Sequence, residues 1–442
     1  MRKSRSRVLL VELIVLCFLA SALGVSVLAE DEYQVTATIQ SPEPESNAFF
    51  GLAIDVNGDF IVISDNKVYV EGIYQAGRVH IFDLDGNLEV TLQSPNPQQD
   101  GRFGNSVAIR QDIVVVGEFQ AHIGDKTDAG RVYIFDSDGS LHATIESPTL
   151  KQRSVFGTSV DFSGDTIIVG EPLADVEETA LAGKVHLYDS DGNLQATIQS
   201  PEPLPDNGFG LSVAGSEGII VVRECSATVE DTVRAGKAYI FDSDGDLLVT
   251  LQSPEPQFNA RFSSSIAVSG DIVVVGECWA EVDGHSKAGR AHIFDTEGNL
   301  LASLQSPEPD AISVFGWSVD ISGDLILIGE PGADGGSAEE GRVYVFDTKG
   351  NLLETLSDPE ATQRAEFGNI VVVRGEIIVV GGFGETKTGR IHIFQPGAAS
   401  APEPSPSPSP KSESPGGIPG FSIESVFLGV LLSVLLIWFS RR

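Results

Sequence analysis

Hydrophobic and polar positions along this chain follow a pattern that repeats at a fixed period. Each interval between copies is 53 residues except the last, which is 52; the seven copies begin at Phe50, Phe103, Phe156, Phe209, Phe262, Phe315 and Phe367. Self-similarity at such a period is typical of propellers and solenoids. Every copy contains strand-like runs separated by turn residues, so we expect one four-stranded propeller blade per copy.

The copy that starts at Phe103 shows the four runs clearly. Small and branched residues at Ser106–Ile109 are followed by a tight turn and by the apolar run Ile113–Val116. A long polar loop leads to Val132–Phe135, and a second tight turn leads to the alternating run Leu141–Glu146. Continuously apolar runs predict strands covered on both faces, whereas the alternating run predicts an outer edge strand. Both tight turns are typical of hairpins.

The two ends of the repeat array indicate that the ring is closed. The last copy stops after its third run, Arg390–Phe394, and a segment of fourth-run type, Val35–Pro42, precedes the first copy. An N-terminal strand that completes the last blade would remove both open sheet edges. We therefore predict an all-β, seven-bladed propeller over residues 30–395, with four-stranded blades and the last blade closed by the N-terminal strand.

The residues that recur in these copies resemble a known repeat. Phe-Gly, then Gly-Asp, then an apolar run that ends in Gly-Glu-Pro, as in the copies that start at Phe156 and Phe315, are similar to the FG-GAP repeat of integrin-α-type propellers and many microbial surface proteins. The resemblance implies an extracellular binding or adhesion module. The calcium sites of that family lie in carboxylate-rich loops between the first two strands. Here that turn, Ser163–Asp165, is too short to surround a cation that takes 6–8 oxygen ligands, so no calcium site is carried over and the cofactor is unknown.

Both ends of the chain predict export and attachment. Basic residues precede an apolar run, Val8–Ala29, which predicts a signal peptide over residues 1–29, with a retained N-terminal anchor as the alternative. Residues 396–420 form a Pro/Ser-rich stalk, and residues 421–442 a hydrophobic anchor or sorting helix. This tail resembles the archaeal PGF-type sorting signal, whose motif is matched by Pro419, Gly420 and Phe421; an ordinary membrane anchor is the alternative. Either interpretation predicts a protein anchored at the cell surface or membrane.

The net charge limits the classes of binding partner, and the positions of two cysteines bear on whether a disulfide forms. A net charge of −35 argues against nucleic-acid binding, which needs basic surface, and is typical of a solvated acidic exterior. Cys225 and Cys278 occupy equivalent positions in neighbouring blades, so propeller geometry predicts that they lie too far apart for a disulfide, whose Cα atoms are at most about 7 Å apart.

Acidic and aromatic residues on the long-loop side of the blades are the candidate ligand-binding residues. Five copies place glutamate directly after the second run: Glu118, Glu171, Glu224, Glu277 and Glu330. Because strand direction alternates, the long loops, these glutamates, Trp279 and Trp317 are expected on one face. Aromatic rings beside carboxylates suit a sugar, a protein or a cationic group. The alternatives are glutamates that only bond a neighbouring backbone, a Trp279 that covers a blade edge and a Trp317 that fills a gap between blades.

Other polar residues favour structural roles. The Asp-x-Asp-Gly segments, such as Asp136–Gly139, predict hairpin turns rather than metal loops, because later ligand positions are missing. One third-run position alternates between histidine and tyrosine, which indicates packing between blades: His80, Tyr133, His186, Tyr239, His292, Tyr344 and His392. Three first-run aspartates either line the channel or are buried in pairs: Asp55, Asp161 and Asp320.

A catalytic constellation is missing from this pattern. No nucleophile–base pair, phosphate loop or zinc spacing is present, so we expect a non-enzymatic protein. The alternative is a secreted propeller enzyme, a hydrolase or lyase acting on polysaccharide, with its site on the long-loop face. His122 and His285 are the histidines that break the repeat in long loops, and neither has an obvious partner.

Overall fold

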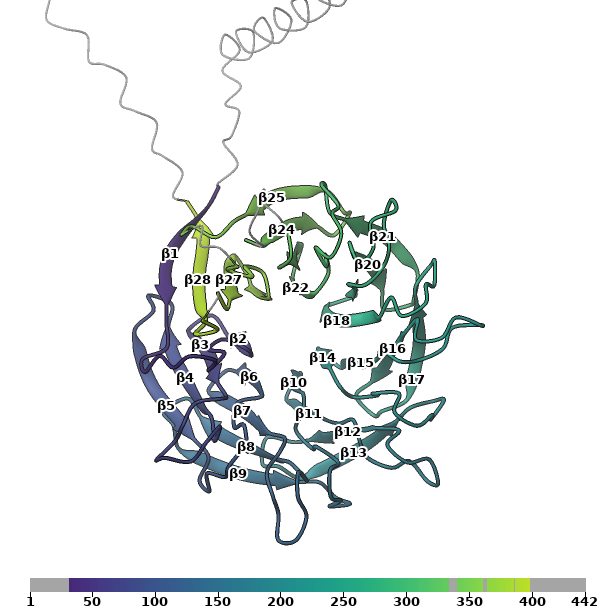
Figure 1. Cartoon of the computed structure of the whole chain (residues 1–442). Coiled ribbons are helices and arrows are strands. Elements are labelled where there is room, and N and C mark those ends of the chain that lie inside the picture. The colour runs from purple at the N-terminus through teal and green to yellow at the C-terminus, as the bar shows by residue number, and fades with distance from the viewer. Residues whose placement is uncertain (1–31, 334–339, 361–363, 385, 398–442) are drawn as a thin grey trace, which may run out of the picture. The chain divides into compact units, whose positions relative to one another are not determined.

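The computed structural model describes residues 32–333, 340–360, 364–384 and 386–397. Within these ranges the regular secondary structure is β-strand, in seven antiparallel sheets of four strands each. The sheets stand around a central channel as the blades of a propeller (Figure 1). The predicted all-β, seven-bladed propeller is thus confirmed. The predicted signal peptide, the stalk and anchor beyond Gly397, and the Pro419–Phe421 motif lie outside the described residues.

Four concentric sets of strands build the ring, and blades 1 to 7 are numbered by the copies from Phe50 to Phe367. The first strands, nearest the channel, are β2 (Ile54–Val56), β6 (Ser106–Arg110), β10 (Val160–Ser163), β14 (Val213–Ser216), β18 (Phe262–Ser269), β22 (Ser318–Ser322) and β26 (Ile370–Arg374). The second strands are β3 (Phe60–Asp65), β7 (Ile113–Glu118), β11 (Thr166–Glu171), β15 (Ile219–Glu224), β19 (Ile272–Glu277), β23 (Leu325–Glu330) and β27 (Ile377–Gly382). The third strands are β4 (Arg78–Asp83), β8 (Arg131–Asp136), β12 (Lys184–Tyr188), β16 (Lys237–Asp242), β20 (Arg290–Asp295), β24 (Arg342–Asp347) and β28 (Arg390–Pro396). The fourth strands, at the rim, are β5 (Leu88–Gln93), β9 (Leu141–Glu146), β13 (Leu194–Gln199), β17 (Leu247–Gln252), β21 (Leu300–Gln305), β25 (Leu352–Leu356) and β1 (Tyr33–Ile39).

Burial along these strands follows the residue pattern. The second and third strands are buried almost throughout, whereas the fourth strands alternate and expose most of their residues. Each hydrophobic cluster joins the facing sides of two neighbouring blades; one contains Val62 and Leu92 of blade 1 together with Phe103 and Tyr133 of blade 2. The Phe that begins every copy is at most 1% exposed. Blades therefore adhere to one another through apolar faces, and this burial is the main stabilising contribution to the ring.

A glycine before each third strand allows the blades to approach closely. Gly130 has a φ of 84°, and a Cβ atom on it would lie 2.0 Å from the backbone oxygen of Phe156 in the next blade. A side chain at this position would therefore collide with backbone that cannot move aside. This contact explains why Ala-Gly precedes most of the third strands.

The N-terminal strand closes the ring as predicted. Strand β1 pairs with β28 in the order β1-β28-β27-β26, so the last blade combines both ends of the described chain. Tyr33 lies opposite Pro396, and Thr38 bonds to the Nδ1 atom of His392 over 3.0 Å. Strand β1 thus covers the edge of β28 at the seam between blades 7 and 1.

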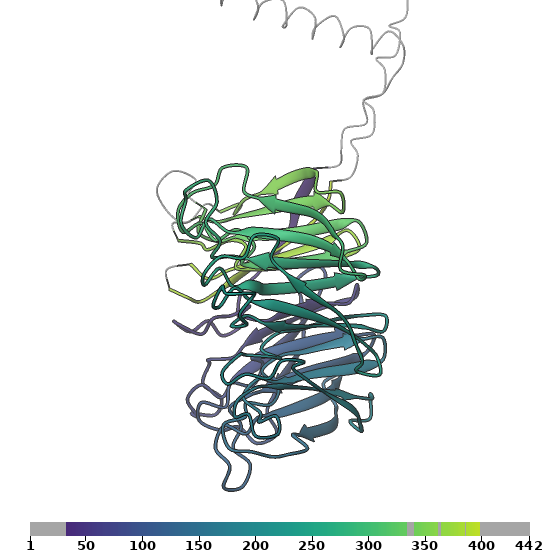
Figure 2. The ribbon, with the colours of Figure 1, turned by 90° about the vertical axis from the view of Figure 1, so that its right-hand side faces the viewer.

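The disc has two different faces (Figure 2). We call the face with the tight turns between strands one and two, and three and four, the hairpin face. The loop face carries the long links from strand two to strand three and from blade to blade. Tyr33 and Pro396, at the ends of the described propeller, pair on the hairpin side. The two ends of the described propeller therefore lie on the side opposite the loop face.

Candidate functional site

The five glutamates that end the second strands of blades 2–6 are buried inside the ring. Their exposed fractions are at most 1%, so their carboxylates do not form an acidic ring at the channel mouth. The expectation that Glu118, Glu171, Glu224, Glu277 and Glu330 contact a ligand is corrected in this respect. The last residue of each second strand turns toward the neighbouring blade, and not toward solvent.

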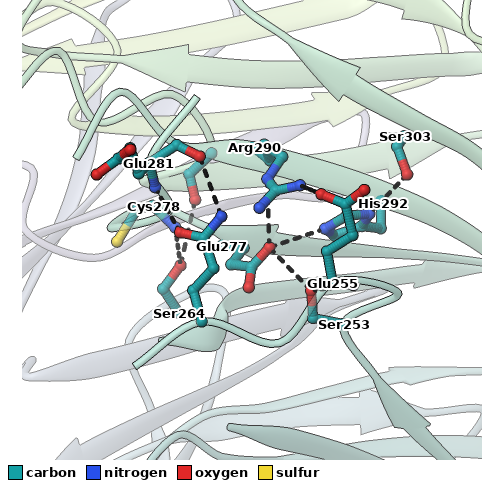
Figure 3. Close-up of polar contacts among 11 residues, drawn as sticks. Ser253, Glu255, Ser264, Glu277, Cys278, Glu281, Arg290, His292 and Ser303 are labelled. Atoms are coloured by element: carbon teal, nitrogen blue, oxygen red, sulfur yellow. Dashed lines mark hydrogen bonds and ion pairs between the residues drawn. The ribbon is translucent and has the colours of Figure 1, made fainter. Parts of the chain in front are cut away.

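Side chains from two blades contact four of these carboxylates, and Glu171 contacts His186 of its own blade over 2.8 Å. In blade 5, Glu277 accepts hydrogen bonds from Ser253 of blade 4 over 3.2 Å and contacts the Nε2 atom of His292 over 3.1 Å (Figure 3). Tyrosine replaces histidine in the even-numbered blades: the Tyr133 hydroxyl donates to Glu118 over 2.7 Å. The alternation between histidine and tyrosine at this position therefore supplies a partner for one buried carboxylate per blade. We call this unit of serine, carboxylate and ring the carboxylate latch.

Latches fasten neighbouring blades. The serine comes from the end of the preceding fourth strand, as Ser94 does for Glu118 and Ser200 for Glu224. The interpretation of these glutamates as structural residues is therefore the better one, although their partners are side chains and not the backbone. A sequence signal could have indicated this pairing of serine with glutamate. Most fourth runs end in Ser-Pro, and that serine lies at a fixed distance before the glutamate of the next copy.

The blades on either side of the seam carry altered latches. Blade 1 has Asp65 in place of glutamate; it accepts from Ser41 over 2.7 Å, but its distance to the Nε2 atom of His80 is 3.9 Å. Blade 7 has Gly382 at the glutamate position, and Asp358 of blade 6 takes the position of the serine. That carboxylate lies 3.6 Å from the Nε2 atom of His392. A cavity of 360 Å³ occupies this altered latch.

Burial dominates the electrostatics of the latches. It raises the pKa of Glu118 and of Asp65 to about 7, against the opposing effect of their hydroxyl donors. Desolvation lowers the pKa of His80 to about 4, so this ring is neutral at pH 7. The pKa of Tyr133 rises to about 12 because of burial and the adjacent Glu118 carboxylate.

Aspartates of three first strands line the central channel. Asp55, Asp161 and Asp320 lie around it together with Arg374 in a cavity of 340 Å³. Arg374 donates to Asp55 over 2.9 Å and to Asp320 over 3.0 Å. Each aspartate also accepts a backbone N–H from the next blade, as Asp161 does from Gly215 over 2.8 Å. The interpretation that these residues line the channel therefore holds for all three, and pairing holds for Asp55 and Asp320, which share Arg374.

The two propeller tryptophans occupy different environments on the loop face. Trp317 is 41% exposed and borders the channel cavity. Trp279 follows Glu277 and Cys278 and is half-buried. The guanidinium of Arg261 lies 3.4 Å from the centre of its ring, and the ammonium of Lys287 lies 4.3 Å away. The charged groups that contact the ring of Trp279 are therefore two cations, whereas the sequence suggested carboxylates.

The remaining candidate groups have structural partners. In the Asp-x-Asp-Gly turns a carboxylate accepts backbone N–H groups, as Asp138 does from Ser140 over 2.9 Å. The His122 ring accepts from the backbone of Asp128 over 3.1 Å. Cys225 and Cys278 are free thiols, as predicted. In the part of the chain that the structure describes, no group of three His, Cys, Asp or Glu residues is arranged to hold a metal ion.

Sequence reasoning overlooked a group of exposed apolar residues on the loop face. Phe258 is 74% exposed and Ile312 is 66% exposed, each at the tip of a link between two blades. Other copies place glutamine at the position of Phe258, at Gln99 and Gln152. A comparison of the link positions between copies is the signal that could have found these residues.

Comparison with known families agrees with the repeat pattern. The FG-GAP repeat family matches residues 88–135 and 302–346. These two segments are similar to the FG-GAP repeat. The matches fall in blades 1–2 and 5–6, and each runs from a fourth strand into the third strand of the next blade. FG-GAP repeats are typical of extracellular domains. A search of curated proteins found no match to this sequence. Among the described residues there is no helix with the length and hydrophobicity to cross a membrane.

Proposed function

We propose that this FG-GAP propeller is a non-enzymatic binding or adhesion module, tethered at the cell surface, that contacts its partner through the loop face. The observation that carries the proposal is the position of the exposed apolar residues. Phe258, Ile312 and Trp317 lie on the loop face in blades 4 to 6, opposite the face where both chain ends leave the propeller. A tether that begins after Gly397 would leave this face directed outward.

The backbone of one link supports the same proposal. Ile312 has a φ of 69°, in the left-handed region that branched side chains rarely adopt. Four other copies place asparagine or aspartate there, residue types that tolerate this conformation (Asn47, Asp100, Asp206 and Asn259), and two place arginine (Arg153 and Arg364). An exposed isoleucine at a strained turn favours a role for the side chain itself, since strain concentrates at functional sites.

A propeller enzyme is the second candidate. The buried acid–base pair beside a cavity is His392 with Asp358. The Nδ1 atom of His392 bonds to Thr38, and its Nε2 atom faces Asp358. Neither ring nitrogen is free to exchange a proton with a substrate, so this pair favours a structural role over general-base catalysis.

Adhesion of purified protein to cell-envelope preparations tests the proposal. The double variant Phe258→Ser, Ile312→Ser should lose most adhesion while its melting temperature stays within a few degrees of the parent. The control is Leu141→Ser, Leu194→Ser, which removes two exposed apolar side chains from the rim. Unchanged adhesion of the loop-face variant, or an equal loss in the rim variant, would show that the loop face is not the contact surface.

A further inference from the structure

We propose that Arg261, Trp279 and Lys287, on the loop face of blade 5, form a binding site for a small oxyanion, namely the carboxylate or sulfate of an acidic sugar. We call it the oxyanion site. This site would define the class of ligand that the binding module recognises. The inference rests on the proposed function in one respect, that the loop face is the contact face.

Two cations share one aromatic ring at this site. Arg261 directly precedes Phe262, and Lys287 lies in the loop between β19 and β20. Their charged groups lie 3.4 and 4.3 Å from the ring centre of Trp279, within the range of cation–π attraction. All three side chains are half-buried, so the charges are positioned by the ring and still reach solvent.

The two cations at this site have no ion-pair partner among the described residues. Arg261 and Lys287 contact the ring of Trp279, and the backbone of Glu281, in the same loop, bonds to the side chain of Gln257. Two like charges on one ring repel each other, and an anion between them would offset that repulsion. The unmatched pair is unusual in a chain whose net charge is −35.

A third cation comes from blade 4. Arg223 stands where the equivalent second-strand residue of blades 2, 3, 5 and 6 is glycine: Gly117, Gly170, Gly276 and Gly329. Its Nε atom is buried and has no hydrogen-bond partner. The charges of Arg223 and Arg261 both reach the Cys278 thiol, where they oppose the rise that burial gives its pKa. Arg223 therefore adds to the positive potential beside Trp279.

Blade 7 provides an internal comparison. Glu366 directly precedes Phe367, as Arg261 precedes Phe262, and Lys387 corresponds to Lys287. In blade 7 these two residues form an ion pair, and Lys387 lies 5.9 Å from the ring of Phe383. Blade 7 thus neutralises its lysine with its own carboxylate. Blade 5 has arginine at the position of that carboxylate, so a carboxylate from a ligand could pair with the lysine instead.

The surrounding surface restricts the size of the ligand. A long polyanion would be repelled by the acidic exterior, whereas a compact group meets only the local cations. The guanidinium of Arg261 can donate two parallel hydrogen bonds to a carboxylate or a sulfate. The uncharged remainder of a sugar would add no repulsion. These features favour a single acidic sugar over an acidic chain.

Calorimetric titration of the full chain with glucuronate, inorganic sulfate and glucose, at constant ionic strength, tests the oxyanion site. Wild-type protein should bind glucuronate or sulfate saturably and should not bind glucose. The stronger of the two ligands identifies a carboxylate or a sulfate as the source. The Arg261→Glu variant reproduces the ion pair of blade 7, so it should fold and lose at least about tenfold in affinity.

Two further variants keep the result interpretable. Arg102→Glu makes the same change in net charge at the equivalent position of blade 2 and should bind like wild type. Lys287→Gln should weaken binding independently if Arg261→Glu does not fold. Absence of anion binding by wild type, or equal losses in Arg102→Glu and Arg261→Glu, would overturn the proposal. Glucuronate binding without adhesion to envelopes would instead refute the adhesion role and leave the oxyanion site intact.

Discussion

In blades 2–6 the second strand ends in a buried glutamate, whereas in blades 1 and 7, on either side of the seam, it ends in Asp65 and Gly382. The latch of blade 7 keeps a carboxylate near its histidine, but Asp358 supplies it from blade 6. A side chain does not fit at Gly382, where a Cβ atom would lie 2.5 Å from the backbone oxygen of Ala365. The comparison shows that each junction retains a carboxylate near the ring, from whichever blade it comes.

The largest expected effect comes from removing the seam itself. Deletion of residues 32–42 removes strand β1, the Thr38 partner of His392 and the Ser41 partner of Asp65. The exposed edge of β28 should then cause aggregation and loss of cooperative unfolding, because open strand edges pair with other chains. Thermal unfolding and size-exclusion chromatography check this. A deletion variant that stays monomeric and melts like the parent would show that β1 is not needed for closure.

Loss of one regular latch should lower the free energy of unfolding by less than loss of the seam, but by more than loss of a surface ion pair. Glu118→Ala leaves Tyr133 and Ser94 without their buried acceptor, so we expect a loss of about 2–4 kcal/mol in the free energy of unfolding. The control is Glu146→Ala, which removes the exposed partner of Arg131 and should change stability by less than about 1 kcal/mol. Urea unfolding measures both. Equal effects of the two substitutions would contradict a structural role for the latch.

The latches also predict how stability depends on pH. Glu118 and Asp65 have folded-state pKa values of about 7, whereas unfolded carboxylates titrate near 4. The folded state therefore holds protons that the unfolded state releases, so stability should fall as pH rises from about 4 to 7. His80, with its pKa lowered to about 4, acts in the opposite direction between pH 4 and about 6.5, and so does His392, whose pKa is lowered by burial. They are two groups against four, because burial also raises the pKa of Glu224 and of Glu330.

We expect the free energy of unfolding to be about 1–2 kcal/mol higher at pH 6 than at pH 8. Urea titrations at the two values measure the difference. Glu118→Gln should reduce it, because the amide does not titrate. A protein that is more stable at pH 8 than at pH 6 would show that these carboxylates are ionised when folded.

The propeller was predictable from the sequence because its signals are local and repeated. Apolar second and third runs, turn residues and the displaced strand Val35–Pro42 fix the blades without knowledge of any contact. The candidate site was less predictable, since the last residue of a strand can face solvent or the next blade, and the pattern around Glu277 is the same in both cases. The cations around Trp279 come from separate loops, which only the folded ring brings together.

The smallest expected effect is a gain in stability at the seam. Asp65 is one methylene shorter than the glutamates of blades 2–6, and its Oδ1 atom and the Nε2 atom of His80 are both buried without hydrogen-bond partners. The equivalent distance in blade 3, from His186 to Glu171, is 2.8 Å, compared with 3.9 Å here. Asp65→Glu should close this gap and add about 1 kcal/mol to the free energy of unfolding. Asp65→Asn keeps the shorter reach and should give no such gain. If Asp65→Glu destabilises the protein, the junction is packed too tightly for the added methylene, and the altered latch is the best fit to its own blade.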